Sequence, residues 1–442
     1  MLNLLKSSVW HPNTQMKEWE SFDKITNGKG IWLIDSDGNK MIDAVASMWC
    51  NVWGHSNPQL IKAISDQSKK LQHSSQFNLT TEPAEKLADS LVKTSPGMHK
   101  VFYSDNGSSA MEIAIKMALQ YWKNIGNEKK TEIATLENGY HGDTFGAMSV
   151  GYVPEFFGKF KKQLFTTIQF PVPNKYRMLK GLTINDYQNF CLDKIEKRFS
   201  KKDNIAAFVM ESGAQVAGGV VIYPKGFQKK ISQICKKYDV LFVLDEIATG
   251  FGRLGSMLQY EEQKSIPDIV AYGKMLTGGY LTMAATLANK KIYNSFLGEF
   301  NDWKHLFHGH TYTGNPIAAA VANQNLKMYK KNNLIKKIQK TSKTFKKFYS
   351  EILEIDIVGD IRHKGMLMGI EIVKDKSKKI PISPKQSINK IFFEEGKKNG
   401  IYLRTLGNIV MIVPPLAITE SELNLLLKRT ILTIKSAKSK VV

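Results

Sequence analysis

Two acids and a lysine follow two apolar segments, and these residue types can do chemistry together. Asp245 and Glu246 come directly after the apolar run Val240–Leu244. Lys274 follows the apolar segment Ile269–Tyr272 after one glycine. Such runs are typical of strands buried in a parallel sheet, and ligands of open α/β sheets bind at the carboxyl ends of the strands. A lysine amine and an acid at that edge suit an aldehyde cofactor such as pyridoxal phosphate, because the amine condenses with the aldehyde and the acid holds the ring nitrogen protonated.

A turn of small polar residues, Ser104–Ser109, joins the strand predicted over 101–103 to the helix predicted over 110–123. Small polar residues at such a turn would place free backbone N–H groups and hydroxyls at the helix start, where a phosphate binds well. Ser and Asn are also common as simple N-caps, so the turn alone leaves both interpretations open. The lysine and acid described above favour the phosphate.

Three aromatic or cationic side chains are further candidates. Tyr140 follows the strand predicted over 133–136 and could lie flat against a planar ring, although packing is the commoner role. Trp49 belongs to a loop with two tryptophans. Aromatic side chains in such a loop usually pack internally, and the alternative is that they face a long apolar substrate. Arg404 ends the strand predicted over 401–404, and its planar fork suits a carboxylate; a surface ion pair is the competing explanation.

A literal GxGxxG pattern spans Gly250–Gly255. In a dinucleotide-binding site these glycines form the tight turn between a strand and a helix. Here Glu246–Thr249 separates the strand from the glycines, and no convincing amphipathic helix follows. A mobile or closely packed glycine loop is therefore the better interpretation.

Strands alternate with helical patterns up to about residue 290, which predicts an α/β fold with a mostly parallel, doubly wound sheet and helices on both faces. One or two long helices are expected over 318–353. Strands over 366–373, 401–404 and 409–413 and a terminal helix from 420 then form a smaller α+β domain. The expected division is an N-terminal segment over 1–55 that joins the small domain, a large cofactor-binding domain over 56–316, and the small domain over 317–442. No role is predicted for 151–200.

The formal net charge is +22, yet only six of the 62 basic residues are arginines. The lysines are scattered, which favours a solvated surface over a nucleic-acid groove. Three cysteines without CxxC spacing predict neither a disulfide framework nor a zinc ribbon, and the histidines at 305, 308 and 310 lack nearby acids or cysteines, so no metal site is expected. No run approaches membrane-spanning length and no secretory segment is recognised, so a cytoplasmic protein is expected.

Seven segments in a fixed order resemble the class III pyridoxal-phosphate aminotransferases, which have the type I fold of these enzymes. The segments cover nearly the whole chain and are Trp10-His-Pro, Tyr103–Ser109, Lys116–Lys123, Asn138–Gly151, Leu244–Arg253, Gly273–Gly279 and His308–Pro316. The resemblance implies that Lys274 binds the cofactor's aldehyde, that Asp245 pairs with the ring nitrogen, and that Tyr140 covers the cofactor and touches the substrate.

The resemblance also implies how the remaining groups bind. Gly107 and Ser108 would hold the cofactor's phosphate, while Thr311, on one loop with Gly309 and His310, would reach the phosphate of the other subunit. The implied assembly is a homodimer with shared active sites. Trp49 would line the pocket, and Arg404 would bind the carboxylate of a long keto acid.

Within the family the chain is most similar to members that convert 8-amino-7-oxononanoate to 7,8-diaminononanoate in biotin synthesis. Members that use S-adenosylmethionine as amino donor commonly carry a Tyr after the early His-Pro and a Trp-Trp pair, where this chain has Asn13 and Met48-Trp49. Some relatives use lysine instead. S-adenosylmethionine is the expected donor and lysine the alternative; another ω-aminotransferase activity and, from a different class, a basic nucleic-acid-binding protein are the rival functions.

Overall fold

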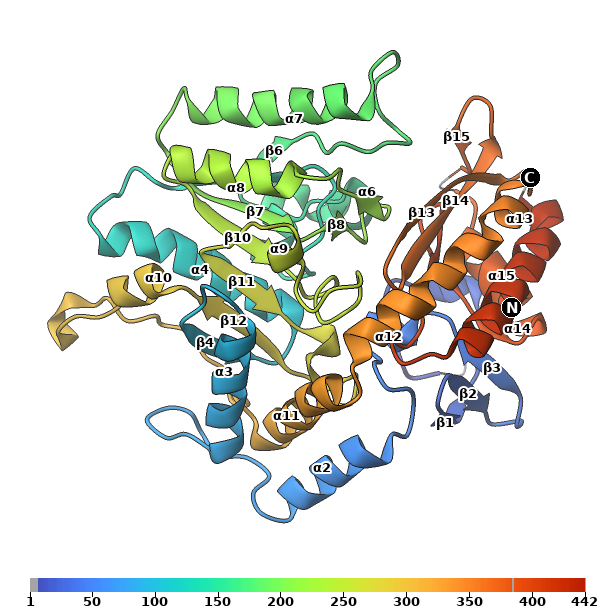
Figure 1. The fold of residues 1–442 in the computed structure, drawn as a ribbon, viewed down its shortest axis with the longest axis horizontal. Helices are drawn as coiled ribbons and strands as arrows, with labels where there is room; N and C mark the ends of the chain where they lie inside the picture. Colours follow the sequence, from blue (N-terminus) through green and yellow to red (C-terminus); the bar gives the residue numbers. More distant parts are fainter. Residues whose placement is uncertain (1–6, 384, 442) are drawn as a thin grey trace.

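The computed structural model describes residues 7–383 and 385–441 and is built around a seven-stranded sheet (Figure 1). In spatial order its strands are β4 (Lys100–Ser104), β12 (Ala284–Ala288), β11 (Ile269–Tyr272), β10 (Leu241–Asp245), β7 (Ile205–Glu211), β5 (Glu132–Leu136) and β6 (Ile168–Phe170). Neighbouring strands are parallel except where β12 runs antiparallel to β4 and β11. The predicted mostly parallel sheet is confirmed.

The residues of β10 alternate between the two faces of this sheet, as side chains of a strand must. Leu241 and Val243 pack in the core beneath α4 (Gly107–Asn124). Phe242 and Leu244 pack in the opposite core, which also contains buried residues of α7 (Ile184–Phe199) and α8 (Phe227–Lys237). Because helices cover both faces, the residues of β10 are all apolar up to Leu244. Asp245, at the carboxyl end of the strand, is the first polar residue.

Two smaller sheets lie beside the large one. A five-stranded sheet contains β13 (Val358–Lys364), β14 (Leu367–Asp375), β18 (Ile409–Ile412) and β17 (Arg404–Leu406), with β15 (Ile380–Pro381) on β14. A four-stranded sheet contains β1 (Ile25–Lys29), β2 (Trp32–Asp35), β3 (Lys40–Asp43) and β16 (Ile401–Tyr402). The parallel pairing of β3 with β16 joins the two ends of the chain, and Figure 1 shows the blue strands beside the red helices. The domain boundaries themselves stay a prediction.

The other elements connect and cover these sheets. The remaining helices are α1 (Ala46–Trp49), α2 (Pro58–Ser68), α3 (Glu82–Thr94), α5 (Phe145–Val150), α6 (Pro154–Phe157), α9 (Gln259–Glu262), α10 (Lys290–Ser295), α11 (Pro316–Lys331), α12 (Leu334–Thr341), α13 (Tyr349–Leu353), α14 (Ile388–Lys398) and α15 (Glu420–Val441). The 3-10 segments are η1 (Met16–Glu18), η2 (Gly158–Gln163), η3 (Lys274–Thr277), η4 (Phe300–Asp302) and η5 (Ser342–Phe348), and a short ribbon pairs β8 (Ala214–Gln215) with β9 (Val221–Ile222).

Two local expectations differ from the structure. The helical stretch expected over 318–353 is broken into α11, α12, η5 and α13; the first break falls at Asn333, whose φ of 49° is left-handed, a conformation that asparagine tolerates. The strand expected over 401–404 is split at Leu403, because β16 pairs with β3 whereas β17 pairs with β18 in another sheet.

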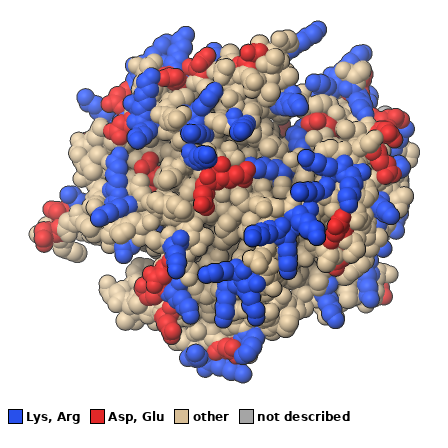
Figure 2. All heavy atoms as spheres, viewed as in Figure 1, with Lys and Arg blue, Asp and Glu red and all other residues tan. Residues whose placement is uncertain are grey.

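Lysine and arginine side chains lie over many elements on the face shown in Figure 2, with acidic side chains among them. On this face the positive charge is spread rather than gathered in one band, as the scattered lysines predict. Among the helices of the described residues, none combines the length and apolar character needed to cross a membrane.

Candidate active site

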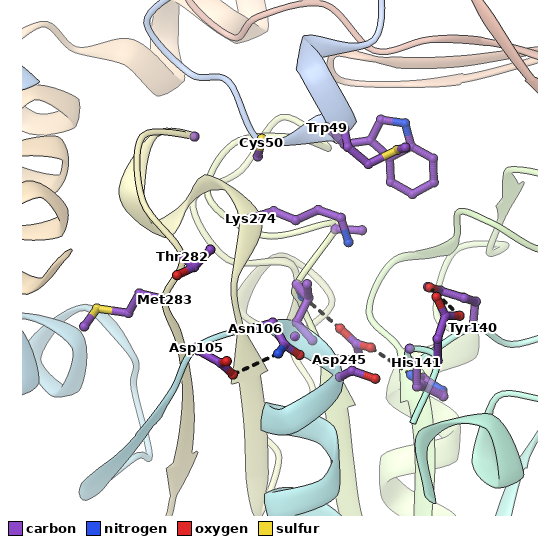
Figure 3. A pocket seen from close by; sticks show the side chains of 18 of the residues that line it. Trp49, Cys50, Asp105, Asn106, Tyr140, His141, Asp245, Lys274, Thr282 and Met283 are labelled. Atoms are coloured by element: carbon purple, nitrogen blue, oxygen red, sulfur yellow. Dashed lines mark hydrogen bonds and ion pairs between the residues drawn. The ribbon is translucent and has the colours of Figure 1, made fainter. Parts of the chain in front are cut away.

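A pocket of about 670 Å³ lies at the carboxyl ends of β7, β10 and β11. Its walls come from segments far apart in the chain, including α1, the start of α4, the loop after β5, and η3. Figure 3 shows Lys274 reaching into the space between Trp49 and Asp245, with Tyr140 and His141 on the neighbouring wall. The predicted site residues that line this pocket are Trp49, Gly107, Ser108, Tyr140, Asp245 and Lys274.

Asp245 is the last residue of β10 and is only 4% exposed. Its Oδ2 lies 2.8 Å from Nδ1 of His141, and its Oδ1 accepts the backbone N–H of Ile247 at 2.9 Å (Figure 3). Both contacts hold the carboxylate in one orientation at the base of the pocket. Negative charge in a site with little water binds a cation strongly, so Asp245 suits a protonated ring nitrogen.

Lys274 begins η3 directly after Gly273 and has a φ of 39°. A left-handed lysine is rare, and such backbone strain is typical of functional sites. Its Nζ lies 5.4 Å from the centroid of the Trp49 ring. Burial lowers the pKa of the Lys274 amine, and nearby carboxylates, Asp245 foremost, oppose that shift. A lowered pKa increases the fraction of neutral amine, which is the nucleophilic form.

Tyr140 lies in the loop after β5 and lines the pocket. Its hydroxyl donates to Oδ1 of Asp143 at 3.1 Å, and its ring stacks on Phe157 with centroids 6.1 Å apart. Burial, followed by the charge of Asp143, raises the pKa of this phenol above its usual range. Tyr140 is therefore a neutral hydrogen-bonding group at ordinary pH.

The first turn of α4 forms the end of the pocket that suits a phosphate. The Asn106 side chain caps the helix by accepting the N–H of Ser109 at 2.9 Å, so the helix starts at Gly107, three residues earlier than expected. The first N–H groups of a helix have no acceptor within it. Gly142, whose φ is 128°, passes so close that a Cβ there would lie 2.0 Å from Oγ of Ser108. Only a glycine allows this close approach of the loop to the helix.

The two acids that follow the central strand separate in the structure. Glu246 does not line the pocket; its carboxylate accepts the backbone N–H groups of Gln259 and Tyr260 and the hydroxyl of Ser212. Burial raises its pKa to about 7. Glu246 therefore holds a loop, and of these two acids Asp245 alone lines the pocket.

The glycine segment Gly250–Gly255 is closely packed around Arg253, a buried side chain. The guanidinium donates to the backbone carbonyls of Pro414 at 2.7 Å and Met366 at 3.0 Å, and its Nη2 lies 3.5 Å from the carbonyl oxygen of Trp49. Burial lowers the pKa of Arg253 to about 10. Through Arg253 the segment connects the backbone of Trp49, in the pocket wall, to residues near the C-terminal strands. Its role is therefore packing, and it does not form the turn of a dinucleotide-binding site.

Four predicted site residues lie outside the pocket of this chain. Gly309, His310 and Thr311 belong to the segment between η4 and α11, where the Thr311 side chain is exposed and its carbonyl lies 2.7 Å from Nε2 of His73. Arg404 begins β17 and is half-buried. Among the described residues it makes no ion pair, and its Nε is buried without a hydrogen-bond partner.

Several residues that line the pocket had no predicted role, among them His141 and Glu211. Glu211 follows the apolar run 205–210 as Asp245 follows 240–244, so the same strand-end reasoning identifies it. His141 carries no comparable signal, because only the folded loop brings its ring to Asp245.

A buried lysine and a strand-end carboxylate in one pocket are the groups that a pyridoxal-phosphate enzyme needs, and comparison with known proteins narrows this class to an aminotransferase. The aminotransferase class-III family matches residues 15–434. The chain belongs to this family and is a pyridoxal-phosphate-dependent aminotransferase, as its resemblance predicts.

The relatives make the family assignment more specific. The chain is 41% identical over 440 residues to adenosylmethionine-8-amino-7-oxononanoate aminotransferase from Aquifex aeolicus, covering 99% of this chain and 97% of the relative. The crystal structure of the enzyme of the same name from Methanocaldococcus jannaschii is 42% identical, with a TM-score of 0.91 and 97% of each chain covered. An omega transaminase from Pseudomonas jessenii, solved in complex with PMP, is 28% identical, with a TM-score of 0.93 and coverage of 98% of this chain and 97% of that one.

Three separate groups of the pocket are suited to bind pyridoxal phosphate. Lys274 offers a buried amine of lowered pKa for the aldehyde, and Asp245 offers an oriented carboxylate for the ring nitrogen. The first turn of α4, closely approached by Gly142, offers free N–H groups for the phosphate. These groups therefore match the aldehyde, the ring nitrogen and the phosphate of the cofactor.

Proposed function

We propose that the protein transfers an amino group from S-adenosylmethionine to 8-amino-7-oxononanoate, giving 7,8-diaminononanoate in biotin biosynthesis. The observation that carries the proposal is the name shared by relatives that are 34–43% identical over at least 93% of this chain. The pocket supports it, because an amine, a carboxylate and an aromatic wall surround a space large enough for both substrates in turn.

Lys274 and Asp245 are proposed to carry the chemistry. When bound, pyridoxal phosphate supplies an aldehyde that condenses with amines and a protonated ring that withdraws electrons. Lys274 would hold the cofactor through its aldehyde. When its Nζ is not engaged in that bond, the amine would be placed to accept and return a proton at the substrate, for which its lowered pKa suits it. Asp245 keeps the ring nitrogen charged, and His141 fixes the orientation of that carboxylate.

Tyr140 and Trp49 are proposed to shape the space around the reacting atoms. The neutral phenol of Tyr140 donates to Asp143, so its oxygen is left to accept a hydrogen bond from a substrate, while its ring covers the cofactor. Trp49 is 7% exposed and has a φ of 67°, so its backbone is held in a left-handed conformation beside the pocket. Its ring, near Nζ of Lys274, excludes water from the amine.

A homodimer with shared active sites is proposed from the placement of the phosphate residues. Gly107 and Ser108 would bind the phosphate within one subunit, and Thr311, with Gly309 and His310, would complete the site of the partner. The support is exposure: the Thr311 loop carries large apolar side chains that face solvent in a single chain, namely Trp303, Phe307 and Tyr312, each at least 61% exposed. Such a patch marks an interface. A cytoplasmic location is also proposed.

Arg404 is proposed to bind the carboxylate of the keto acid. We expect Arg404→Ala to raise the KM for the keto acid about 30-fold, because loss of a hydrogen-bonded partner for its carboxylate costs about 2 kcal/mol when the arginine is only half-buried. The donor half-reaction should change by less than about twofold, because the role proposed for this side chain concerns only the carboxylate of the keto acid. Arg404→Lys should be intermediate, because it keeps the charge and loses the fork. Steady-state kinetics with each substrate varied separately would measure these effects.

The matched control for this variant is Lys428→Ala, which removes an exposed positive charge from α15. Its kinetic constants should equal those of the wild type. Equal increases for both substrates in Arg404→Ala would contradict the role as a carboxylate anchor.

The amino donor is tested by half-reactions. The holoenzyme would be mixed with S-adenosylmethionine or with lysine, and the absorbance of the bound cofactor followed. We expect S-adenosylmethionine to bleach the band and the keto acid to restore it. Bleaching by lysine alone would move the assignment to the alternative donor, which Asn13 and Met48 motivate; Met48 lines the pocket and Asn13 does not.

Other class III activities are separated by the acceptor. In an ω-aminotransferase, pyruvate or a similar small keto acid would restore the absorbance of the bound cofactor, and 8-amino-7-oxononanoate would not do so selectively. A nucleic-acid-binding protein would show binding that falls steeply with added salt. Neither outcome is expected.

A further inference from the structure

Glu211 occupies a position equivalent to Asp245, one strand away. It is the last residue of β7, and the register of the parallel pair places it opposite Asp245. It lines the pocket and is only 4% exposed. A second buried carboxylate beside the first is costly, so its retention needs a reason.

The two oxygens of Glu211 hold two different loops. Oε1 accepts the backbone N–H of Tyr140 at 3.2 Å, and Oε2 accepts the backbone N–H of Val216 at 2.9 Å. The Tyr140 bond lies next to the backbone of His141, whose ring contacts Asp245. One carboxylate therefore anchors the segment that carries both the ring-covering tyrosine and the partner of Asp245.

We propose that Glu211 is a positioning residue, whose ionised carboxylate holds the Tyr140–His141 segment in the geometry that binds the cofactor. Neither oxygen can be spared, because each accepts one N–H group. A carboxylate offers two acceptors, whereas a carboxamide offers one acceptor and one donor. In Glu211→Gln one of the two N–H groups would face an NH₂ group, and the longer bond, to Tyr140, should be the one released.

The surroundings of Glu211 make this anchor sensitive to pH. Burial raises its pKa to about 7, with Asp245 acting in the same direction and His141 and the two N–H donors opposing it. The titratable groups that face it are Tyr140 and His141 from the loop after β5, Asp245 from β10, Lys274 from η3 and Tyr223 from the segment after β9. Above pH 7 the carboxylate is ionised and accepts both bonds; below pH 7 it is protonated and the anchor weakens.

The test compares cofactor dissociation from wild type and Glu211→Gln between pH 5.5 and 8, by dilution of the holoenzyme and measurement of released cofactor. Taking the ratio of the two dissociation constants at each pH cancels the effect of every other group that titrates equally in both proteins. We expect the dissociation constant of the variant to exceed that of the wild type about tenfold at pH 8, the effect of losing one hydrogen bond to a charged group. The ratio should approach one at pH 5.5, with its midpoint near 7.

Glu246→Gln is the matched control, because Glu246 is equally buried, has a pKa of about 7, and also holds backbone N–H groups, yet lies outside the pocket. The ratio of its cofactor dissociation constant to that of the wild type should stay constant between pH 5.5 and 8. A pH-independent ratio for Glu211→Gln, or the same step in Glu246→Gln, would overturn the proposal. If Glu211→Gln fails to fold, Glu211→Asp should retain the step with reduced amplitude, and a wild-type dissociation constant without any step between pH 6 and 8 would also overturn it.

This inference rests on the proposed role of Tyr140, but its failure is distinguishable from failure of the proposed function. Cofactor dissociation is measured without either substrate, so a different donor or acceptor would leave the result unchanged. Tyr140→Phe tests the tyrosine itself: loss of the hydroxyl keeps the backbone N–H, and therefore should preserve the pH step that Glu211→Gln removes.

Discussion

We expect Lys274→Ala to lose at least about 10³-fold in turnover while the protein stays folded and still binds pyridoxal phosphate. The loss combines two functions of one amine, covalent attachment and proton transfer, and proton transfer alone contributes about 10²–10⁴-fold. The fold should persist because Lys274 makes no ion pair with the residues that the structure describes, so alanine only relieves the burial of its amine and leaves η3 intact. Turnover would be measured with the keto acid, and folding by thermal unfolding.

Lys290→Ala, which removes an exposed lysine at the start of α10, is the control and should have wild-type turnover. A second measurement needs no variant. Borohydride reduction of the holoenzyme followed by peptide mass analysis should add one pyridoxyl group to the peptide that contains Lys274. A modified peptide elsewhere, or near-normal turnover in Lys274→Ala, would remove this residue from the mechanism.

The second large effect is expected for Asp245→Asn. The amide has nearly the same shape, but it has no negative charge to pair with the ring nitrogen and can present an NH₂ group to Ile247 or His141, where the carboxylate accepts. Loss of one member of a buried charge pair costs about 3–5 kcal/mol, so turnover should fall about 10²- to 10³-fold. The absorbance of the bound cofactor should also shift, because the ring would lose its proton. Kinetics and spectra of the holoenzyme at one pH would measure both.

Asp268→Asn provides the comparison. Asp268 is also a largely buried aspartate at a strand of the central sheet, where it accepts the N–H of Phe242 at 2.9 Å and the Asn289 amide at 2.8 Å, but it does not line the pocket. It should lower stability and leave the cofactor spectrum unchanged. A normal spectrum in Asp245→Asn would show that the ring nitrogen is held by another group.

The fold could be predicted because its signals are local. Apolar runs such as 205–210 and 240–244 are buried on both faces, so their composition alone identifies them as central strands. The first acid after each run then marks the end of the strand. The breaks were harder to predict. Leu403 interrupts a strand because neighbouring residues pair with different sheets, and that choice depends on β3, more than 350 residues earlier in the chain.

Residue types at strand ends were enough to identify Lys274 and Asp245, since parallel strands bring their carboxyl ends to one edge whatever the details of packing. The sequence by itself thus determined the class of chemistry and the groups proposed to perform it. Only the tertiary structure decided that Glu246 turns away to hold a loop, that His141 meets Asp245, and that Glu211 anchors the Tyr140 segment. The reason is physical: a hydrogen bond is made over about 3 Å in a fixed direction, and no spacing along the chain encodes where two distant loops come that close.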